Sequence, residues 1–358
     1  MLPRTSRSAE ESSPARSPVG VVARRALLPG ARVVVTGGAG FIGSHLCEVL
    51  LRRGHAVHAV DDLSSGALAN LTAAGAWPGF RATVASVADP AVAAAICGEA
   101  DYVFHLAGEV GVRRLAEQPV EVMLRNLRVT EAVTAAAAAA AVPLLFASSS
   151  EVYGDGPVPF REAGSVRPGA TEGGRGGYAC AKAMGEWLAF GHAAQFGLPV
   201  VVARLFNTVG PRQSGDYGMV LPRFVRQALA GEPITVYGDG RQARCFAHVG
   251  DVAQALADLA AVPSAHGRVV NVGSAVETSV LALAQMVRTL AGSSSPIVCT
   301  PFRDVFPRGF VDPPRRVPCL ERLRDAIGWV PATPIEAIVG ELLAVARLDR
   351  SLGACVSG

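Results

Sequence analysis

Short runs of apolar residues alternate with amphipathic segments through the first 206 residues of this chain. Runs rich in Val, Leu and Ile that end at Gly, Ser or Asn are typical of buried strands. Segments with apolar residues every three or four positions are typical of helices that cover a sheet. We expect strands at 32–36, 55–60, 81–84, 102–106, 143–147 and 199–205. We expect helices at 41–53, 91–97, 119–141 and 178–196. This alternation predicts an α/β fold with a doubly wound parallel sheet covered on both faces.

A glycine-rich turn, TGGAGFIG, stands between the first expected strand and the first expected helix. Gly37 permits a tight turn, Gly40 lets a pyrophosphate approach the backbone, and Gly43 lets the helix pack on the strand. The first helical residues, Phe41 and Ile42, would point their amide groups at the phosphates. The turn therefore predicts a Rossmann-type dinucleotide site at the start of the sheet.

Two later strand ends extend this expected site. Asp61 ends the second strand, where a carboxylate accepts both hydroxyls of an adenosine ribose and repels a 2′-phosphate. We therefore predict NAD, and not NADP, as the cofactor. Ala107 follows the fourth strand, in HLAG, where a small residue would border the nicotinamide half. We expect His105 in the same segment to be a packed histidine at a strand end, not a ligand or base.

After residue 206 the alternation becomes less regular. We expect a helix at 220–230, a strand at 234–237, a helix at 249–259, a strand at 268–272, and helices at 280–291 and 335–348. This part predicts a smaller mixed α/β C-terminal substrate domain. The expected division is a disordered tail at 1–30, an NAD-binding Rossmann domain at 31–206, a substrate domain at 207–350 that is interleaved with the first, and a short tail at 351–358.

Charge and cysteine usage exclude several classes of protein. The formal net charge of +3 comes from the arginine-rich N-terminal tail, and the remaining basic and acidic residues balance. This balance argues against a nucleic-acid partner. No uninterrupted apolar run is long enough to span a bilayer, and we identify no signal peptide. The seven cysteines lack CxxC or Cys/His metal spacing, so we expect no metal site and a cytoplasmic protein with reduced thiols.

The chain has 32 arginines and one lysine, Lys182, which follows Tyr178 by four positions. Such a pair shares one helix face. An ammonium beside a phenol stabilises the phenolate, so we expect Tyr178 to have a lowered pKa and to serve as a base near neutral pH. For the YxxxK motif alone, a chance pair on a solvated helix face is the alternative.

Taken together, ordered motifs along residues 31–345 resemble the extended short-chain dehydrogenase/reductase family, its NAD-dependent nucleotide-sugar epimerases, dehydratases and decarboxylases. The motifs are TGGAGFIGSH (36–45), DDLSSG (61–66), HLAG (105–108), SSSEVYG (148–154), YACAK (178–182), LFNTVGPR (205–212), YGDGRQARCF (237–246) and GWVP (328–331). The resemblance implies that Tyr178 takes the proton of a sugar hydroxyl while hydride leaves its carbon for NAD. It implies that Lys182 binds the nicotinamide ribose and that Ser149 hydrogen-bonds the reacting oxygen.

Other positions match the family pattern less uniformly. Asn126 fits a structural asparagine of the long helix, and three residues match substrate contacts: Asn207 and Arg244 at the diphosphate, and Tyr237 near the nucleotide base. Two features depart from the pattern. Ser86 stands where the family often has an Asp that binds adenine, with Asp89 three residues on, and the loop at 164–177 is longer and richer in glycine.

The residues after Ser149 favour one chemistry. Oxidation at C4 would give a 4-keto sugar, from which epimerisation, loss of water or loss of carbon dioxide can follow. Ser150 stands where similar dehydratases carry an acid, and an alcohol is a far weaker proton donor, so dehydration is disfavoured. The Ser150-Glu151 pair, together with Arg316 in DPPRRVP (312–318), is similar to UDP-glucuronate decarboxylases. A guanidinium there would hold a substrate carboxylate or help to protonate the enolate. We therefore predict a UDP-glucuronate decarboxylase that forms UDP-xylose.

Three alternatives stay open. The segment GVRR after HLAG looks more like UDP-sugar 4-epimerases. In the second alternative, Glu151 is a structural loop acid, and Arg315 and Arg316 are surface charges. A non-catalytic NAD-binding protein on the same fold is the third, although the Ser149, Tyr178 and Lys182 set argues against it. The resemblance also implies a homodimer that forms through the helices of Asn126 and Tyr178.

Overall fold

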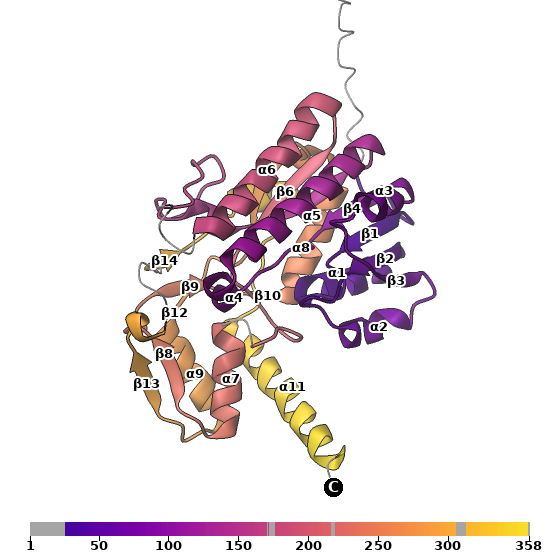
Figure 1. The fold of residues 1–358 in the computed structure, drawn as a ribbon. Helices are drawn as coiled ribbons and strands as arrows, with labels where there is room; N and C mark the ends of the chain where they lie inside the picture. The colour runs from indigo at the N-terminus through magenta and orange to yellow at the C-terminus, as the bar shows by residue number, and fades with distance from the viewer. Residues whose placement is uncertain (1–25, 170, 172–175, 216–218, 306–312, 357–358) are drawn as a thin grey trace, which may run out of the picture.

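A seven-stranded parallel sheet forms the centre of the molecule. The computed structural model describes residues 26–169, 171, 176–215, 219–305 and 313–356 (Figure 1). The strand order is β11–β6–β5–β4–β1–β2–β3, and every neighbouring pair is parallel. The strands are β1 (Arg32–Thr36), β2 (Ala56–Asp61), β3 (Phe80–Val84), β4 (Tyr102–His105), β5 (Leu144–Ser149), β6 (Val200–Leu205) and β11 (Arg268–Val272). The predicted doubly wound fold is confirmed. The strand order reverses between β1 and β4, where such sheets bind ligands at the carboxyl ends of the strands.

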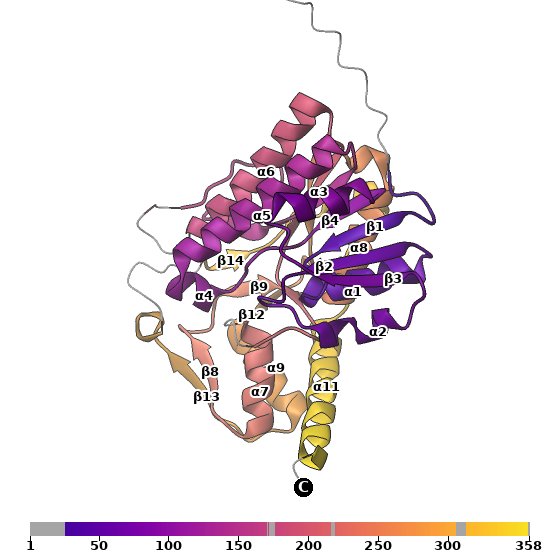
Figure 2. The same cartoon turned by 45° about the vertical axis from the view of Figure 1, so that its right-hand side comes forward.

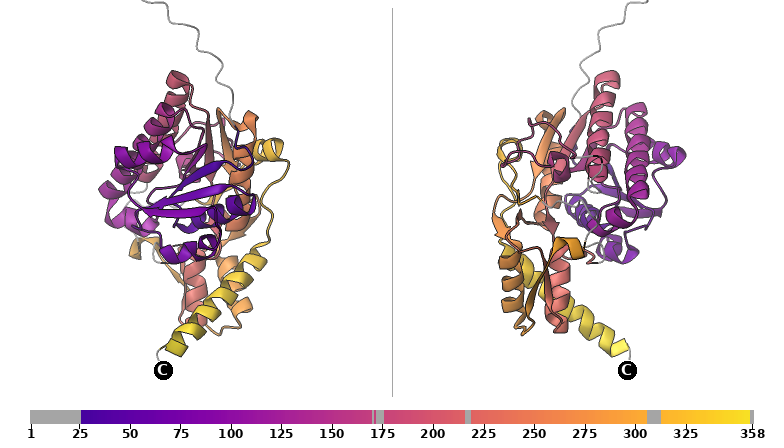
Figure 3. Two further views of the ribbon diagram at one scale, coloured as in Figure 1. Left: turned by 90° about the vertical axis from the view of Figure 1, so that its right-hand side faces the viewer. Right: turned by 60° about the vertical axis from the view of Figure 1, so that its left-hand side comes forward.

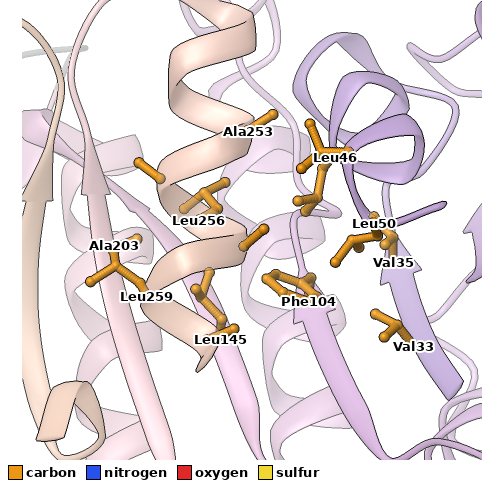
Figure 4. Packing of buried hydrophobic residues seen from close by; sticks show 14 of the residues in the cluster. Val33, Val35, Leu46, Leu50, Phe104, Leu145, Ala203, Ala253, Leu256 and Leu259 are labelled. Carbon is orange, nitrogen blue, oxygen red and sulfur yellow. The ribbon is translucent and has the colours of Figure 1, made fainter. Parts of the chain in front are cut away.

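Helices cover both faces of this sheet because successive strand residues point to opposite sides. On one face α1 (Phe41–Arg52) and α8 (Val249–Ala261) pack on Val33 and Val35 of β1, and Figure 4 shows their leucines meeting Phe104 and Leu145. On the other face α3 (Pro90–Gly98), α5 (Pro119–Ala139) and α6 (Gly176–Phe196) pack on Val34. Short helices lie at the margins: α2 (Thr72–Gly75), α4 (Val112–Glu117) and α10 (Glu321–Ile327).

A second, smaller group of elements has its own core. Strands β8 (Ile234–Tyr237) and β13 (Ile297–Thr300) pair in parallel, and α7 (Val220–Ala230), α9 (Val280–Ala291) and α11 (Ile335–Val356) accompany them. Leu221, Phe224, Leu283 and Ile338 are fully buried in this core. Figures 2 and 3 show these elements together below the large sheet, with α11 running outward to the C-terminus.

Very short strands connect the two groups. β9 (Ala243–Cys245) lies between β12 (Glu277–Ser279) and β14 (Arg315–Arg316), and β10 (Ala247–His248) pairs with β7 (Thr208–Val209). Segments of two or three residues carry too little hydrophobic pattern to be recognised as strands in a sequence. These strands were therefore absent from our expectations, although β9 and β14 hold two of the predicted site residues.

The second half of the chain completes the large sheet. β11 pairs with β6, and α8 packs against α1 on the sheet face, which is where the two predicted domains interleave. The boundaries of the expected division differ at both ends. Leu27 is buried and donates its backbone N–H to Ala260 O at 2.9 Å, so residues 26–30 are ordered against the core and are not tail. Residues 351–356, also expected as tail, continue α11. Residues 1–25 of the expected tail lie outside the described residues.

Candidate active site

The glycine turn leaves no room for side chains between β1 and α1. Gly37 has a φ of +70°, which favours glycine. A β-carbon on Gly43 would lie 2.1 Å from Gly37 O, and one on Gly37 would lie 2.7 Å from Ala107 N. Gly40 precedes the first helical residue, Phe41, in an extended conformation and places no side chain over the helix start. The amides of the first turn of α1, which have no carbonyl partner within the helix, thus fit the pyrophosphate of a dinucleotide.

The backbone orients the Asp61 carboxylate at the end of β2. Its two oxygens accept hydrogen bonds from Ala39 N at 3.0 Å and Leu63 N at 2.8 Å. Burial raises the pKa of Asp61, and these backbone hydrogen bonds lower it. Each carboxylate oxygen can accept more than one hydrogen bond, so Asp61 keeps acceptor capacity for the two ribose hydroxyls of NAD. This geometry fits the predicted cofactor.

His105 is packed at the end of β4. Its Nδ1 lies 2.8 Å from Thr36 Oγ1, which also accepts the Ala107 N–H at 3.2 Å, and its ring stacks on Phe146. Burial first, and then the charge of Lys182, lower its pKa to about 3. The imidazole therefore stays neutral at physiological pH and orders the segment that carries Ala107.

Ser149, Tyr178 and Lys182 come together where β5 ends against α6. Lys182 Nζ donates to Ala147 O at 3.1 Å, and Ser149 hydrogen-bonds Tyr178. Asn126 of α5 lies beside Lys182, because a β-carbon built on Gly108 would be 2.7 Å from Asn126 Oδ1 and 3.1 Å from Lys182 Nζ. The structure thus assembles the predicted set from three different elements.

The expected lowering of the tyrosine pKa was wrong for this structure. Burial raises the pKa of Tyr178, the Glu151 charge adds to the rise, and the Ser149 hydrogen bond opposes it. Lys182 is itself buried, which lowers its pKa to about 8, and the Glu186 charge raises it. The sequence shows the i, i+4 spacing, but it does not show that both groups lose their water, and desolvation disfavours both charged forms.

Glu151 and Arg316, 165 residues apart in sequence, form a bidentate ion pair. Arg316 Nη1 lies 2.7 Å from Glu151 Oε1, and Arg316 Nη2 donates to Oε2 at 2.8 Å. Arg316 is 3% exposed, so it is not the surface charge of the alternative interpretation. Its Nε has no hydrogen-bond partner within the described part of the chain. The pair adjoins the tyrosine, because Glu151 N lies 3.3 Å from Ser149 Oγ and Glu151 shifts the Tyr178 pKa.

Of the other predicted residues, Arg244 and Ser150 adjoin this pair, whereas Asn207 and Tyr237 have contacts of their own. Arg244 is buried on β9, and in the parallel register of β9 and β14 it is the partner of Arg316. Asn207 Nδ2 donates to Cys245 O at 3.4 Å, one position from Arg244. The Arg223 guanidinium lies 3.8 Å from the centroid of the Tyr237 ring. Ser150, also predicted, is buried beside Glu151 in a short 3-10 turn.

The two departures from the expected pattern have distinct outcomes. Asp89 caps α3 by accepting the Ala91 N–H at 2.8 Å, and Ser86 is exposed. The Asp89 carboxylate is thus engaged by a helix terminus. Part of the glycine-rich loop at 164–177, residues 170 and 172–175, lies outside the described residues.

The sequence profile described as the NAD dependent epimerase/dehydratase family matches residues 33–273. The chain belongs to this family. Over 305 residues it is 40% identical to a UDP-N-acetyl-alpha-D-glucosaminuronate decarboxylase of Bacillus cytotoxicus, covering 84% of this chain and 92% of that protein. It is 34% identical to UDP-glucuronic acid decarboxylase 1 of Danio rerio, covering 85% and 70%. The fold is similar to that of a UDP-N-acetylglucosamine 4-epimerase from Methanobrevibacter ruminantium M1 solved with UDP-N-acetylmuramic acid, with a TM-score of 0.79, 28% identity and coverage of 88% and 98%.

This member of the epimerase/dehydratase family also has a buried ion pair that sequence reasoning missed. Arg204 of β6 donates to both oxygens of Glu186 at 2.9 and 2.6 Å, and Ser148 donates to the same carboxylate at 2.6 Å. Glu186 lies one turn beyond Lys182 on α6. An arginine inside the apolar run of 200–205 was the available signal, because a buried charge requires a partner.

Two further kinds of site are not found in the described ranges. No group of three His, Cys, Asp or Glu side chains there could hold a metal ion. Within the same residues, no helix combines the length and the apolar character needed to cross a bilayer.

Proposed function

We propose that this chain removes carbon dioxide from a UDP-linked uronic acid through a 4-keto intermediate, with UDP-glucuronate or its 2-acetamido counterpart as substrate. The observation that carries the proposal is the ion pair of the buried Arg316 with the half-buried Glu151, beside Ser149 and Tyr178. Both decarboxylase relatives named above act on uronic acids of this kind according to their names. A carboxylate at C6 of the sugar is the substrate group that a buried guanidinium recognises best.

The first step oxidises C4 of the sugar. The phenolate form of Tyr178 would accept the proton of the C4 hydroxyl and become a phenol, with Ser149 holding the oxygen and the positive charge of Lys182 favouring the phenolate before the transfer. Bound NAD supplies a hydride acceptor for this step and a hydride donor for the last one. Gly37, Gly40, Gly43 and Asp61 would hold it, as the fit of the turn and the carboxylate supports.

The second step breaks the C5–C6 bond. Its electron pair moves toward the C4 carbonyl and leaves an enolate, since the ketone lies β to the carboxylate. A proton added at C5 restores the ketone, and its reduction at C4 gives the pentose product. The sugar loses one carbon dioxide and gains one proton, with no net oxidation. Arg316, held by Glu151, would bind the carboxylate and stabilise the negative charge that develops.

A 4-epimerase is the second candidate function. The GVRR segment at 111–114 and the fold of the Methanobrevibacter 4-epimerase favour it. An epimerase uses the same oxidation at C4 and returns the hydride to the other face of the ring. It needs no group to stabilise carbon dioxide loss, so the buried guanidinium of Arg316, paired with Glu151, favours decarboxylation. A 4,6-dehydratase is less favoured because Ser150 would have to serve as the acid.

The proposal includes a homodimer and a cytoplasmic location. Large apolar side chains are exposed along the adjacent helices α5 and α6: Val120, Leu124, Met184 and Trp187. Trp187 is 63% exposed, and large apolar side chains exposed on neighbouring helices support an interface there. The six described cysteines are free thiols, which supports a reducing compartment.

To test the proposal, wild-type protein is incubated with UDP-glucuronate and with its 2-acetamido counterpart, and the release of carbon dioxide is measured. The same assay is applied to Arg316→Met and to Arg315→Met. Arg315 is the matched control, because it is exposed and pairs with Glu277 on the surface. We expect Arg316→Met to lose about 10²–10³ in the rate of decarboxylation, as when an electrostatic stabiliser is removed, and Arg315→Met to stay near wild type. Equal rates in the two variants would contradict the proposal.

A further inference from the structure

Asn271, in β11, is fully buried and uses its whole side chain in hydrogen bonds. Its Nδ2 donates to Phe160 O at 2.9 Å and to Cys319 O at 3.1 Å. Its Oδ1 accepts the hydroxyl of Tyr153 at 2.7 Å. Its backbone N–H donates to Glu162 Oε1 at 3.0 Å. One side chain of the large sheet therefore connects three separate chain segments.

Two of these segments carry the ion pair of the site. Tyr153 ends the 3-10 turn of residues 150–153, so it lies two positions after Glu151. Cys319 lies three positions after Arg316. Phe160 lies between them: its N–H donates to Val317 O at 2.8 Å, and its O accepts the Cys319 N–H at 2.8 Å. The contacts of Asn271 thus fix the end of each segment that bears a member of the pair.

The segments are also packed against each other as rigid units. The rings of Tyr153 and Phe160 are stacked, with centroids 4.7 Å apart and planes 8° apart. Both rings belong to a small buried cluster that includes Val152 and Phe206. Close-packed interiors transmit displacements instead of absorbing them. A change at Asn271 would therefore move the 3-10 turn of residues 150–153 and β14 relative to each other.

Asparagine is the residue that this position requires. Two N–H groups meet two carbonyl oxygens, and one carbonyl oxygen meets a hydroxyl. An ionised aspartate offers no donor, and a leucine of similar size offers neither donor nor acceptor. Either replacement would leave the Phe160 and Cys319 carbonyls without this donor in a buried place.

We propose that Asn271 is a positioning residue that sets the separation of Glu151 and Arg316 for the step that releases carbon dioxide. This inference rests on the proposed decarboxylation, and it assigns Asn271 no contact with the substrate. We expect its effect to fall mainly on the second step, because Tyr178 and Lys182 are held by α6 and Ala147 O, whereas Glu151 lies in the same 3-10 turn as Tyr153.

The experiment compares wild type, Asn271→Asp and Tyr153→Phe as full-length proteins with bound cofactor. Each is incubated with the UDP-uronic acid that wild type consumes. Borodeuteride traps the 4-keto uronate that retains its carboxylate, and mass spectrometry measures this species and the decarboxylated product. We expect Asn271→Asp to release carbon dioxide about 10²-fold more slowly, as a misplacement near 1 Å does. Tyr153→Phe loses one hydrogen bond, so we expect a decrease of about two- to tenfold.

The distinguishing readout is the ratio of trapped 4-keto uronate to product, which we expect to rise in both variants. A merely structural role would lower both species in parallel with the amount of folded protein. Tyr102→Phe is the matched control, because it deletes a buried hydroxyl that contacts His266, away from the pair. We expect its ratio to equal that of wild type. An unchanged ratio in Asn271→Asp and Tyr153→Phe would overturn the inference.

Crystal structures of the variants separate this inference from the proposed function. We expect the Glu151–Arg316 contact to be broken or lengthened in Asn271→Asp. An unchanged contact overturns the role of Asn271, whatever the activity. Wild type that releases no carbon dioxide overturns the proposed function, whereas a displaced pair in the variant would still establish Asn271 as the positioning residue of that pair.

Discussion

Replacing Lys182 with methionine should stabilise the protein while abolishing its activity. The ammonium of Lys182 is buried, 4% exposed, and makes one hydrogen bond to the residues that the structure describes, at Ala147 O. Burial lowers its pKa from 10.5 to about 8. The difference corresponds to about 3 kcal/mol of folding free energy that the charged lysine costs at neutral pH. Methionine removes this cost and loses about 1 kcal/mol of hydrogen bonding, so we expect a net gain of about 2 kcal/mol.

The pH dependence of this gain has a definite sign. The unfolded chain holds the Lys182 proton up to its ordinary pKa of 10.5, and the folded chain releases it above about 8. Between these values the unfolded state binds more protons, so the stability of wild type rises with pH. Below a pH of about 8 the cost of the buried charge is fully present. The advantage of Lys182→Met should therefore be about 2 kcal/mol at pH 7 and close to zero by about pH 9.5.

Denaturant unfolding of wild type, Lys182→Met and Lys182→Arg at the two pH values measures this effect. The cofactor is removed from all three proteins, because bound NAD would stabilise the folded state by mass action. Arginine keeps its charge throughout this range, so any loss of unfolding free energy in Lys182→Arg relative to Lys182→Met should persist when the pH is raised. A methionine variant that is less stable than wild type at pH 7, or whose advantage does not change with pH, would refute the reasoning.

Two further substitutions test the cofactor turn and the buried ion pair. Gly43→Ala places a β-carbon 2.1 Å from Gly37 O, so α1 must move, and we expect the affinity for NAD to fall by about tenfold or more in a calorimetric titration. Gly75→Ala is the control: its β-carbon would have no atom within 4 Å, so we expect this variant to bind NAD as wild type does. Glu186→Gln leaves Arg204 buried without its counterion, so denaturant unfolding should show a loss of about 3–5 kcal/mol, and Ser148→Ala a loss of about 1 kcal/mol. If Glu186→Gln and Ser148→Ala lost a similar amount of stability, the buried charge of Arg204 would not be the cause of the Glu186→Gln loss.

The large sheet could be predicted from the sequence because most of its strands are buried apolar runs that alternate with helical segments. The glycine turn and Asp61 were predictable for a related reason: close approach of backbone to backbone allows few residue types. Both signals are local. The conformation of each segment depends mainly on residues within a few positions of it.

The parts that sequence reasoning missed depend on distant contacts. Glu151 and Arg316 were each proposed from a motif, yet their ion pair depends on β14, a strand of two residues. Asn271 has an ordinary position in an apolar strand, and only the fold shows that its side chain hydrogen-bonds Tyr153, Phe160 and Cys319. The expected lowering of the Tyr178 pKa was wrong because the burial of the phenol depends on how the site is assembled. The ion pair and the Tyr178 pKa thus depend on long-range packing, which the spacing of residues in the sequence does not show.

The central claim, that a buried guanidinium serves a substrate carboxylate, is tested most directly by the mass of the product. Purified protein is incubated with UDP-glucuronate and with the 2-acetamido uronate, and each nucleotide sugar is analysed by mass spectrometry. We expect one of them to yield a product lighter by the mass of carbon dioxide, and Arg316→Met to form this product about 10²–10³-fold more slowly. A product of unchanged mass and altered retention would show epimerisation and contradict the account.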